Sequence, residues 1–115
     1  MSNNNELKDG PWINYYFNGQ LAEKGNYKDG KREGPCSSYF CVNGQLIYEG
    51  NYKDGKEEGP YSSYYYNGQL MQKGSFKEGK REGPWVSYHE DGSVNSEFTC
   101  FYKDGSMAQF DLGAI

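Results

Sequence analysis

The sequence predicts an all-β fold: a single-domain solenoid of about four β-hairpin repeats that form one elongated, twisted antiparallel sheet. Three observations support this prediction. A segment of 24 or 25 residues recurs along the chain, each copy carries two turn signals that end in glycine, and the runs between the turns are rich in Tyr, Phe and Ser. With 115 residues the chain has room for one domain.

The repeats define the expected domain organisation, because each unit begins with Gly-Pro. The units start at Gly10, Gly34, Gly59 and Gly83. We expect a flexible N-terminus over residues 1–6, the repeat domain over residues 7–106, and a C-terminal cap strand or tail over residues 107–115. An isolated hairpin is marginally stable, so neighbouring units must bury their apolar surface together.

Two kinds of turn alternate along the chain. The first is Asn18-Gly19 and its equivalents, with Asp91-Gly92 in the last unit. Asn-Gly accepts positive φ at both central positions, which predicts a two-residue type I′ hairpin turn. The second begins with Asp29-Gly30 and continues as Lys-Arg-Glu-Gly, which predicts a longer loop. The turns therefore predict an up-and-down meander of eight to nine short strands.

The predicted turn at Asn18-Gly19 sets the pairing of the first hairpin. It would place Tyr16 opposite Leu21 and Trp12 opposite Gly25, all on one face, because side chains alternate along a strand. A glycine opposite an aromatic residue leaves space for the ring to lie over the backbone. We expect this structural face to carry Trp12, Gly25, Tyr27, Gly50, Tyr52, Tyr61, Gly74, Phe76 and Trp85.

The opposite face is predicted to carry one tyrosine per unit. Those tyrosines are Tyr15, Tyr39, Tyr64 and Tyr88, with Ile47 and Met71 beside them. Tyrosine supplies amphipathic contact area with a polar tip, so we predict these six residues as a partner-binding site. The alternative is that the ladder only supports neighbouring strands by cross-strand stacking.

The composition limits the class of partner. A hydrophobic fraction of 35% is low, but an aromatic fraction of 17% argues against disorder, because disordered chains are poor in aromatic residues. The net charge is −4, whereas nucleic acids and anionic membranes reward basic patches. We therefore expect a protein partner with basic or mixed charge, and no nucleic acid.

The cysteines indicate a reducing compartment. Cys36, Cys41 and Cys100 show no disulfide framework, the N-terminus is unlike a secretory signal, and no apolar run is long enough to span a membrane, so we expect a cytoplasmic protein. With His89 the cysteines could in principle form a zinc site. Cys36 occupies a position that is aromatic in the other units, so we interpret it as a small apolar filler. We expect no metal and no cofactor.

No motif predicts catalysis. Gly50–Lys56 matches the pattern Gly-x4-Gly-Lys of a phosphate-binding loop, but Glu57 follows instead of Ser or Thr, and no helix begins there. His89 is followed by acids that are adjacent in a turn, not converging from separate elements as a catalytic triad requires. The loop acids are expected to be solvated: Glu33, Glu57, Glu58 and Glu82. The sequence therefore predicts a protein that is not an enzyme.

One stretch resembles a known repeat. Gly25 to Gly34, read as Gly-Asn-Tyr-Lys-Asp-Gly-Lys-Arg-Glu-Gly, resembles the core of a MORN repeat. Together with Tyr-Tyr-x-Asn-Gly-Gln-Leu it is similar to the bacterial variant in the YwqK-type toxin–antitoxin antitoxin family. The pattern recurs at Gly50–Gly59 and Gly74–Gly83, whereas the last unit has Phe98 or its neighbour in place of the repeated glycine, as in a terminal cap.

The resemblance implies a β-hairpin solenoid used for protein–protein contact. In the antitoxin-like members the implied partner is a toxin, a nucleic-acid-directed enzyme whose active site is blocked, and some MORN proteins are credited with membrane association. We expect a non-catalytic inhibitor of the antitoxin or immunity type. The alternatives are a mobile-element inhibitor of a host defence enzyme, an anionic-lipid-associated membrane scaffold, and a structural protein that self-associates through open sheet edges.

Overall fold

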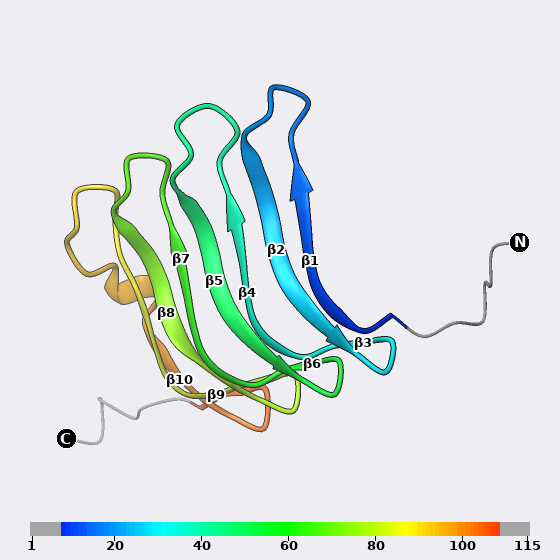
Figure 1. Cartoon of the computed structure of the whole chain (residues 1–115). Coiled ribbons are helices and arrows are strands. Elements are labelled where there is room, and N and C mark those ends of the chain that lie inside the picture. Colours follow the sequence, from blue (N-terminus) through cyan, green and yellow to red (C-terminus); the bar gives the residue numbers. More distant parts are fainter. Residues whose placement is uncertain (1–7, 109–115) are drawn as a thin grey trace, which may run out of the picture.

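The computed structural model describes residues 8–108 and shows one antiparallel sheet (Figure 1). Its strands are β1 (Gly10–Tyr15), β2 (Leu21–Lys28), β3 (Lys31–Arg32), β4 (Gly34–Tyr39), β5 (Leu46–Lys53), β6 (Lys56–Glu57), β7 (Gly59–Tyr64), β8 (Leu70–Lys77), β9 (Lys80–Ser87), β10 (Cys100–Lys103) and β11 (Ser106–Ala108). A short 3-10 helix, η1 (Ser96–Phe98), precedes β10. The predicted flexible segment 1–6 lies outside the described residues.

The spatial order of the strands is β1-β2-β4-β5-β7-β8-β9-β10-β11, with β3 paired to β2 and β6 paired to β5. Every described pairing is antiparallel and joins strands that are close in the sequence, as expected when each unit is a hairpin stacked on the preceding one. The prediction of an all-β solenoid of about four repeats in one elongated sheet is confirmed. Residues 8–108 form eleven strands instead of the eight or nine predicted, because the residues on either side of an Asp-Gly turn also pair with each other.

The two kinds of turn have the reverse of the predicted geometries. Asp29 and Gly30 have φ values of 53° and 80°, and Lys28 pairs directly with Lys31. Two positive φ values between directly paired residues define a two-residue type I′ turn. The prediction of a longer loop here was wrong. Lys31 and Arg32 form β3, which pairs with the end of β2, and this pairing ends at Arg32.

The first and third Asn-Gly loops are one residue longer than predicted, and the second, between Phe40 and Gln45, is two residues longer. In the first loop only Gly19 has a positive φ, and its N–H donates to the carbonyl of Tyr16 at 2.9 Å. This is a type I turn followed by a left-handed glycine, the usual three-residue hairpin loop. The predicted pair of Tyr16 with Leu21 was wrong, because Leu21 pairs with Tyr15 and the N–H of Tyr16 donates to Gln20.

The side chain of the loop asparagine explains this choice. Asn18 Oδ1 accepts the N–H of Gln20 at 3.0 Å, and this bond holds the loop. The amide nitrogen then donates to a backbone carbonyl in the loop of the next repeat. These bonds run from Asn18 to Cys41 at 3.4 Å, from Asn43 to Tyr66 at 2.9 Å and from Asn67 to Glu90 at 3.0 Å. The Asn-Gly loops therefore form a hydrogen-bonded row along one border of the sheet (Figure 1).

A similar row runs along the opposite border, at the Asp-Gly turns. One glutamate per repeat accepts the N–H of the first residue of the next turn. The bonds join Glu33 to Asp54 at 2.9 Å, Glu58 to Glu78 at 2.9 Å and Glu82 to Asp104 at 3.0 Å. The expectation that these three acids are merely solvated was wrong, since each satisfies a backbone donor of its neighbour.

The aromatic face of the sheet is built from rings that lie over glycines. Trp12 lies over Gly25, with 2.7 Å between a Cβ placed at residue 25 and the ring carbon Cζ2. The confirmed register, Trp12 opposite Gly25, places them there. Tyr61 lies over Gly50 and Trp85 over Gly74. These rings also contact one another: the Tyr61 and Trp85 centroids are 5.7 Å apart, and Phe76 is 5.0 Å from Trp85.

The direction of the rings explains Cys36. Trp12 leans onto the glycine of its own repeat, whereas Tyr61 and Trp85 lean back onto the glycine of the preceding repeat. Each of the three glycines is therefore covered by one ring. Four repeats supply four equivalent positions for such a ring, and the one that carries no ring is Cys36, opposite Gly50. Cys36 and Trp85 are the buried apolar residues among those described, as expected for a sheet with so thin a core.

The C-terminal end of the sheet differs from the inner repeats. Cys100 pairs with Trp85 and so occupies the position of the repeated glycine, which corrects the assignment of that position to Phe98 or its neighbour. A glycine is not needed here because Trp85 leans the other way, over Gly74. The predicted cap segment 107–115 contributes Met107 and Ala108 to β11, paired with β10, and its remainder lies outside the described residues.

Candidate functional site

The tyrosine face, defined by Tyr15, Tyr39, Tyr64 and Tyr88, is positioned by the repeat register. Two of the four phenols are fixed by polar neighbours on that face. The hydroxyl of Tyr64 donates to Glu49 Oε1 at 3.0 Å, and that of Tyr39 lies 3.2 Å from Ser37 Oγ. Burial and, after it, the Glu49 carboxylate raise the pKa of Tyr64, which keeps this phenol a hydrogen-bond donor.

Tyr15, Tyr39 and Tyr64 are the last residues of β1, β4 and β7, and Tyr88 directly follows β9. These are alternate strands of the path β1-β2-β4-β5-β7-β8-β9. Neighbouring strands are about 4.8 Å apart, so successive tyrosines are about 10 Å apart. Tyr15 is 63% exposed because no described strand covers its outer side, while the other three are half-buried. The result is a row of rings with fixed spacing, one ring from each repeat.

A row of alternating charge crosses the same face beside the tyrosines. The register aligns Lys24 with Ser37, Ser37 with Glu49, Glu49 with Ser62, and Ser62 with Lys73. Three exposed charges of alternating sign are thus separated by small serines, two strands apart from one another. Such a row can pair with charges of either sign, so it sets orientation more than overall attraction.

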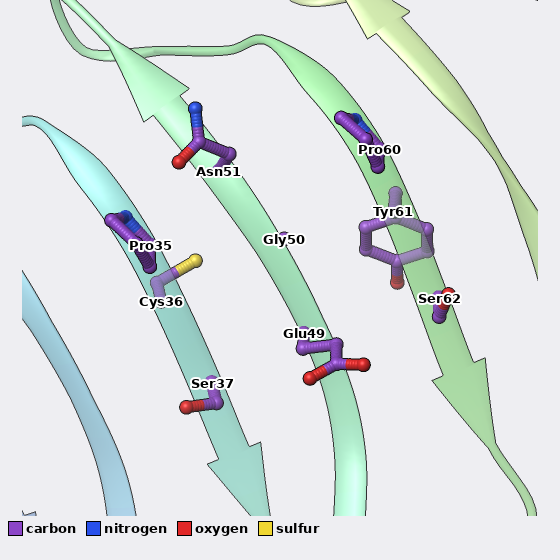
Figure 2. Close-up of a pocket in the computed structure, with 9 residues that line it drawn as sticks. All are labelled: Pro35, Cys36, Ser37, Glu49, Gly50, Asn51, Pro60, Tyr61 and Ser62. Carbon is purple, nitrogen blue, oxygen red and sulfur yellow. The ribbon is translucent and has the colours of Figure 1, made fainter.

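Because serine side chains are small, the centre of this face is hollowed. A pocket of about 380 Å³ spans β4, β5 and β7 and is lined by Pro35, Cys36, Ser37, Glu49, Gly50, Asn51, Pro60, Tyr61 and Ser62. Figure 2 shows Gly50 in its middle, between Cys36 on one strand and Tyr61 on the other. Since Ser37 and Glu49 contact Tyr39 and Tyr64, the pocket adjoins the tyrosine row. A protruding partner side chain could enter it.

A second pocket lies at the C-terminal end of the row. It measures about 350 Å³ and is lined by Tyr65, Met71, Gln72, Ser87, Tyr88, Asn95 and Phe98. Two of the predicted site residues, Met71 and Tyr88, meet there. Ile47 lies on β5 in the position of Met71, one repeat away, and does not line this pocket.

Sequence reasoning missed the apolar residues at the tips of the Asn-Gly loops. Phe17 is fully exposed and Val42 is 78% exposed, while Tyr66 is also exposed. Each precedes the Asn-Gly pair of its repeat. Under the predicted two-residue turn these residues would belong to a strand, and only the longer loop places them at the tip. An apolar residue before Asn-Gly in three successive units was the available signal.

The aromatic face combines rings with arginines. The guanidinium carbon of Arg32 is 5.2 Å from the ring centre of Trp12 and 5.4 Å from that of Tyr52, and Arg81 lies 4.2 Å from Trp85. Cation–π contacts of this kind add stability to a thin sheet. Glu57 occupies the equivalent position of the second unit, and burial raises its pKa. Burial also raises the pKa of Tyr48 to about 12.

The residues considered as metal ligands do not come together within residues 8–108. No group of three His, Cys, Asp or Glu side chains comes together there. The three cysteines are free thiols, and Cys36 is buried in the aromatic face. Gly50–Lys56 forms the end of β5, a type I′ turn at Asp54-Gly55 and the start of β6, so its phosphate-loop pattern is a product of the hairpin. No described helix is long and apolar enough to cross a membrane.

Comparison with known families agrees with the repeat geometry. Four segments, residues 8–29, 43–54, 57–78 and 81–104, match the family described as the MORN repeat variant, and together they cover well over half of the chain. The chain belongs to the MORN repeat variant family. MORN repeats are generally modules that bind proteins or lipids, and they are generally not enzymes. Comparison with curated proteins found no match.

Proposed function

We propose that this MORN repeat chain binds another protein through its tyrosine face and inhibits it, in the manner of an antitoxin or an immunity protein. The observation that carries the proposal is the row of four tyrosines at one position of four successive repeats. Tyrosine gives a large, rigid contact area at a low cost in conformational entropy, because only two torsions must be ordered. The hydrogen-bonded loop rows on both borders keep that area in one shape.

The charge of the chain favours a partner with a basic surface. The net charge is −4, and enzymes that act on nucleic acid carry the basic surfaces that phosphates require. An acidic, extended sheet that covers such a surface would exclude the substrate. We therefore propose a toxin or nuclease-like enzyme as the partner. An inhibitor that a mobile element directs against a host defence enzyme would use the same chemistry, and the identity of the bound enzyme distinguishes the two.

We propose that this binding takes place in the cytoplasm. The three cysteines are free, and one of them is needed as a small filler in the aromatic face. Free thiols persist in a reducing compartment.

The decisive experiment is co-purification from source cells with the tagged chain, compared with a Tyr39→Ser, Tyr64→Ser double variant. A matched control, Lys28→Ser with Lys53→Ser, changes two exposed residues beside the Asp-Gly turns. We expect one stoichiometric protein with the wild type and the control, and loss of that protein with the tyrosine variant at an unchanged thermal midpoint. Equal recovery with both double variants would remove the tyrosine face from the proposal.

Inhibition is then tested by adding the purified chain to the recovered enzyme. We expect activity to fall to a residual level at a one-to-one ratio with the wild type, and to persist with the tyrosine variant. Anionic phosphatidylserine vesicles provide the contrasting probe. Salt-sensitive vesicle binding together with no protein partner would contradict the proposal and assign the module to lipid.

A further inference from the structure

Strand β1 forms an open edge of the sheet (Figure 1). It pairs with β2 on one side, and within residues 8–108 no strand lies on its other side. Its equivalents β4, β7 and β9 each pair on both sides. The edge leaves Ile13 51% exposed and Tyr15 63% exposed, whereas the equivalent residues of β9, Val86 and Tyr88, are half-buried.

The unpaired backbone groups of this edge can be assigned. In an antiparallel strand, alternate residues direct both their N–H and C=O to the same neighbour. Tyr88, the equivalent of Tyr15, donates its N–H to Met71 in the preceding repeat at 2.8 Å. No described repeat precedes the first, so Ile13 and Tyr15 direct their N–H and C=O groups outward. Pro11 belongs to the same set and offers only its carbonyl.

The edge carries little protection against pairing. Natural edge strands are usually blocked by charged side chains, by proline or by bulges. The sequence of β1, Gly-Pro-Trp-Ile-Asn-Tyr, has no charged residue. Its proline lies near one end and its irregularity at Asn14 and Tyr15 lies near the other, so the middle of the strand around Ile13 is regular.

The opposite end of the sheet presents a much shorter edge. There Ser87 would present the free edge of β9, but its N–H is bonded to Thr99 Oγ1 at 3.1 Å and its carbonyl accepts the N–H of Asn95 at 2.7 Å. Its hydroxyl donates to the carbonyl of Phe98 at 2.9 Å. Beyond this segment β10 and the short β11 cover the remainder of β9. The described residues thus leave the six-residue strand β1 as a long edge at one end of the sheet, and the three-residue strand β11 as a short edge at the other.

We propose that two copies of the chain pair antiparallel through their β1 strands, forming a closed two-fold dimer with one continuous sheet. With Ile13 on the two-fold axis, the N–H and C=O of Ile13 pair with those of Ile13 in the second copy. Each Tyr15 N–H then donates to the Pro11 carbonyl of the other copy, so every outward donor of β1 is used. A head-to-tail contact would build fibres, but the short C-terminal edge, three residues of β11 against six of β1, disfavours it.

Electrostatic repulsion does not oppose this arrangement. The charges nearest the axis are those of β2, such as Lys24, which is one strand away from β1. In the dimer the two Lys24 residues would be three strand spacings apart, about 14 Å, which exceeds the Debye length of about 8 Å at physiological ionic strength. The dimer would also join two tyrosine faces into one, with both copies of Ile13 and Tyr15 at its centre.

Solution mass as a function of concentration tests the proposal. We expect the wild type to run as a dimer at micromolar concentration and as a monomer on dilution. Ile13→Lys should shift the midpoint at least tenfold toward higher concentration, because two lysines would meet at the axis. Val42→Lys, which adds the same charge at an exposed loop tip, should leave the midpoint unchanged. A wild type that stays monomeric, or one that forms open-ended oligomers, overturns the proposal.

Cross-linking tests the register separately. Residues on the axis have Cα atoms about 5.5 Å apart, within the range that a disulfide spans. We expect Ile13→Cys to give a covalent dimer under mild oxidation. Phe17→Cys introduces a more exposed thiol, but four residues from the axis the two copies are about 27 Å apart. Cross-linking through residue 17 and not through residue 13 would show that the copies meet elsewhere.

Discussion

The indole ring of Trp85 lies directly over the backbone of Gly74, so that a methyl group at residue 74 would overlap the ring carbons Cδ2 and Cε2. Trp85 is completely buried, and its Nε1 donates to the carbonyl of Ser75 at 3.0 Å. This pair closes the junction of the third and fourth repeats. The loss of stability on replacing the repeated glycine by a larger residue should therefore differ from one repeat to another.

Gly74→Ala should destabilise the protein far more than Gly50→Ala. The added methyl must displace a fully buried indole at residue 74, which costs about 1–3 kcal/mol as overpacking. At residue 50 a Cβ would be 3.3 Å from the Tyr61 ring, a contact that a small shift relieves, and the lost flexibility of the unfolded chain offsets part of the cost. Urea unfolding measures both. Equal losses would show that the rings are not closely packed on the glycines.

The two tryptophans should respond differently to the same substitution. Trp85→Phe removes the hydrogen bond to Ser75 and leaves a buried carbonyl without its donor, at a cost of about 1–3 kcal/mol beyond the lost ring area. Trp12 Nε1 is buried without a partner, so Trp12→Phe removes an unpaired donor. We expect the free energy of unfolding to fall more for Trp85→Phe than for Trp12→Phe. The reverse order would contradict the assigned hydrogen bond.

Asn67→Asp tests the loop row. A carboxylate keeps the acceptor for the N–H of Gln69 but has no hydrogen to donate to the carbonyl of Glu90. We expect a loss of about 1 kcal/mol in the free energy of unfolding, the usual net value of one hydrogen bond. Asn43→Asp, which removes the equivalent bond to the carbonyl of Tyr66, should cost a similar amount. A neutral Asn67→Asp would show that the loops are independent.

Glu57 should make stability depend on pH. Burial raises its pKa, and the opposing effect of Arg81 is smaller. The folded state therefore holds this proton more tightly than the unfolded chain, so the contribution is present below the ordinary pKa of a glutamate and is lost as pH rises through the raised value. We expect Glu57→Gln to raise the urea midpoint near neutral pH and to have little effect in acid. The same difference at both pH values would point to packing instead, and Glu90→Gln in an exposed loop is the control.

Much of the fold could be predicted from the sequence because its signals are local. The period of 24 or 25 residues, the glycine turns and the pairing of Trp12 with Gly25 each depend on residues close together in the chain. They led to the correct fold class and to the correct register in the middle of the first hairpin, but not at its turn. The tyrosine row follows from the same period. The grouping of Met71 with Tyr88 beside Phe98 did not, because η1 brings Phe98 back from a segment with no equivalent in the other repeats.

The tertiary structure alone decided how neighbouring repeats meet. The bond from the Asn18 amide to the next loop exists only when the repeats are stacked. The three-residue loop itself is held locally by Asn18 Oδ1 and the N–H of Gln20, and the Asn-Gly dipeptide alone pointed to the wrong turn. Each ring can lie over the glycine of its own repeat or over that of the preceding repeat, and only the stacked repeats show which one it covers. With Gly25 covered by Trp12 and Gly50 covered by Tyr61, no ring is needed at the position of Cys36. Local chemistry determined that hairpins form and where they turn. Contacts between repeats decided the placement of the rings, the bonds between loops and the difference between the long and the short edge of the sheet, because those energies exist only once the hairpins are stacked.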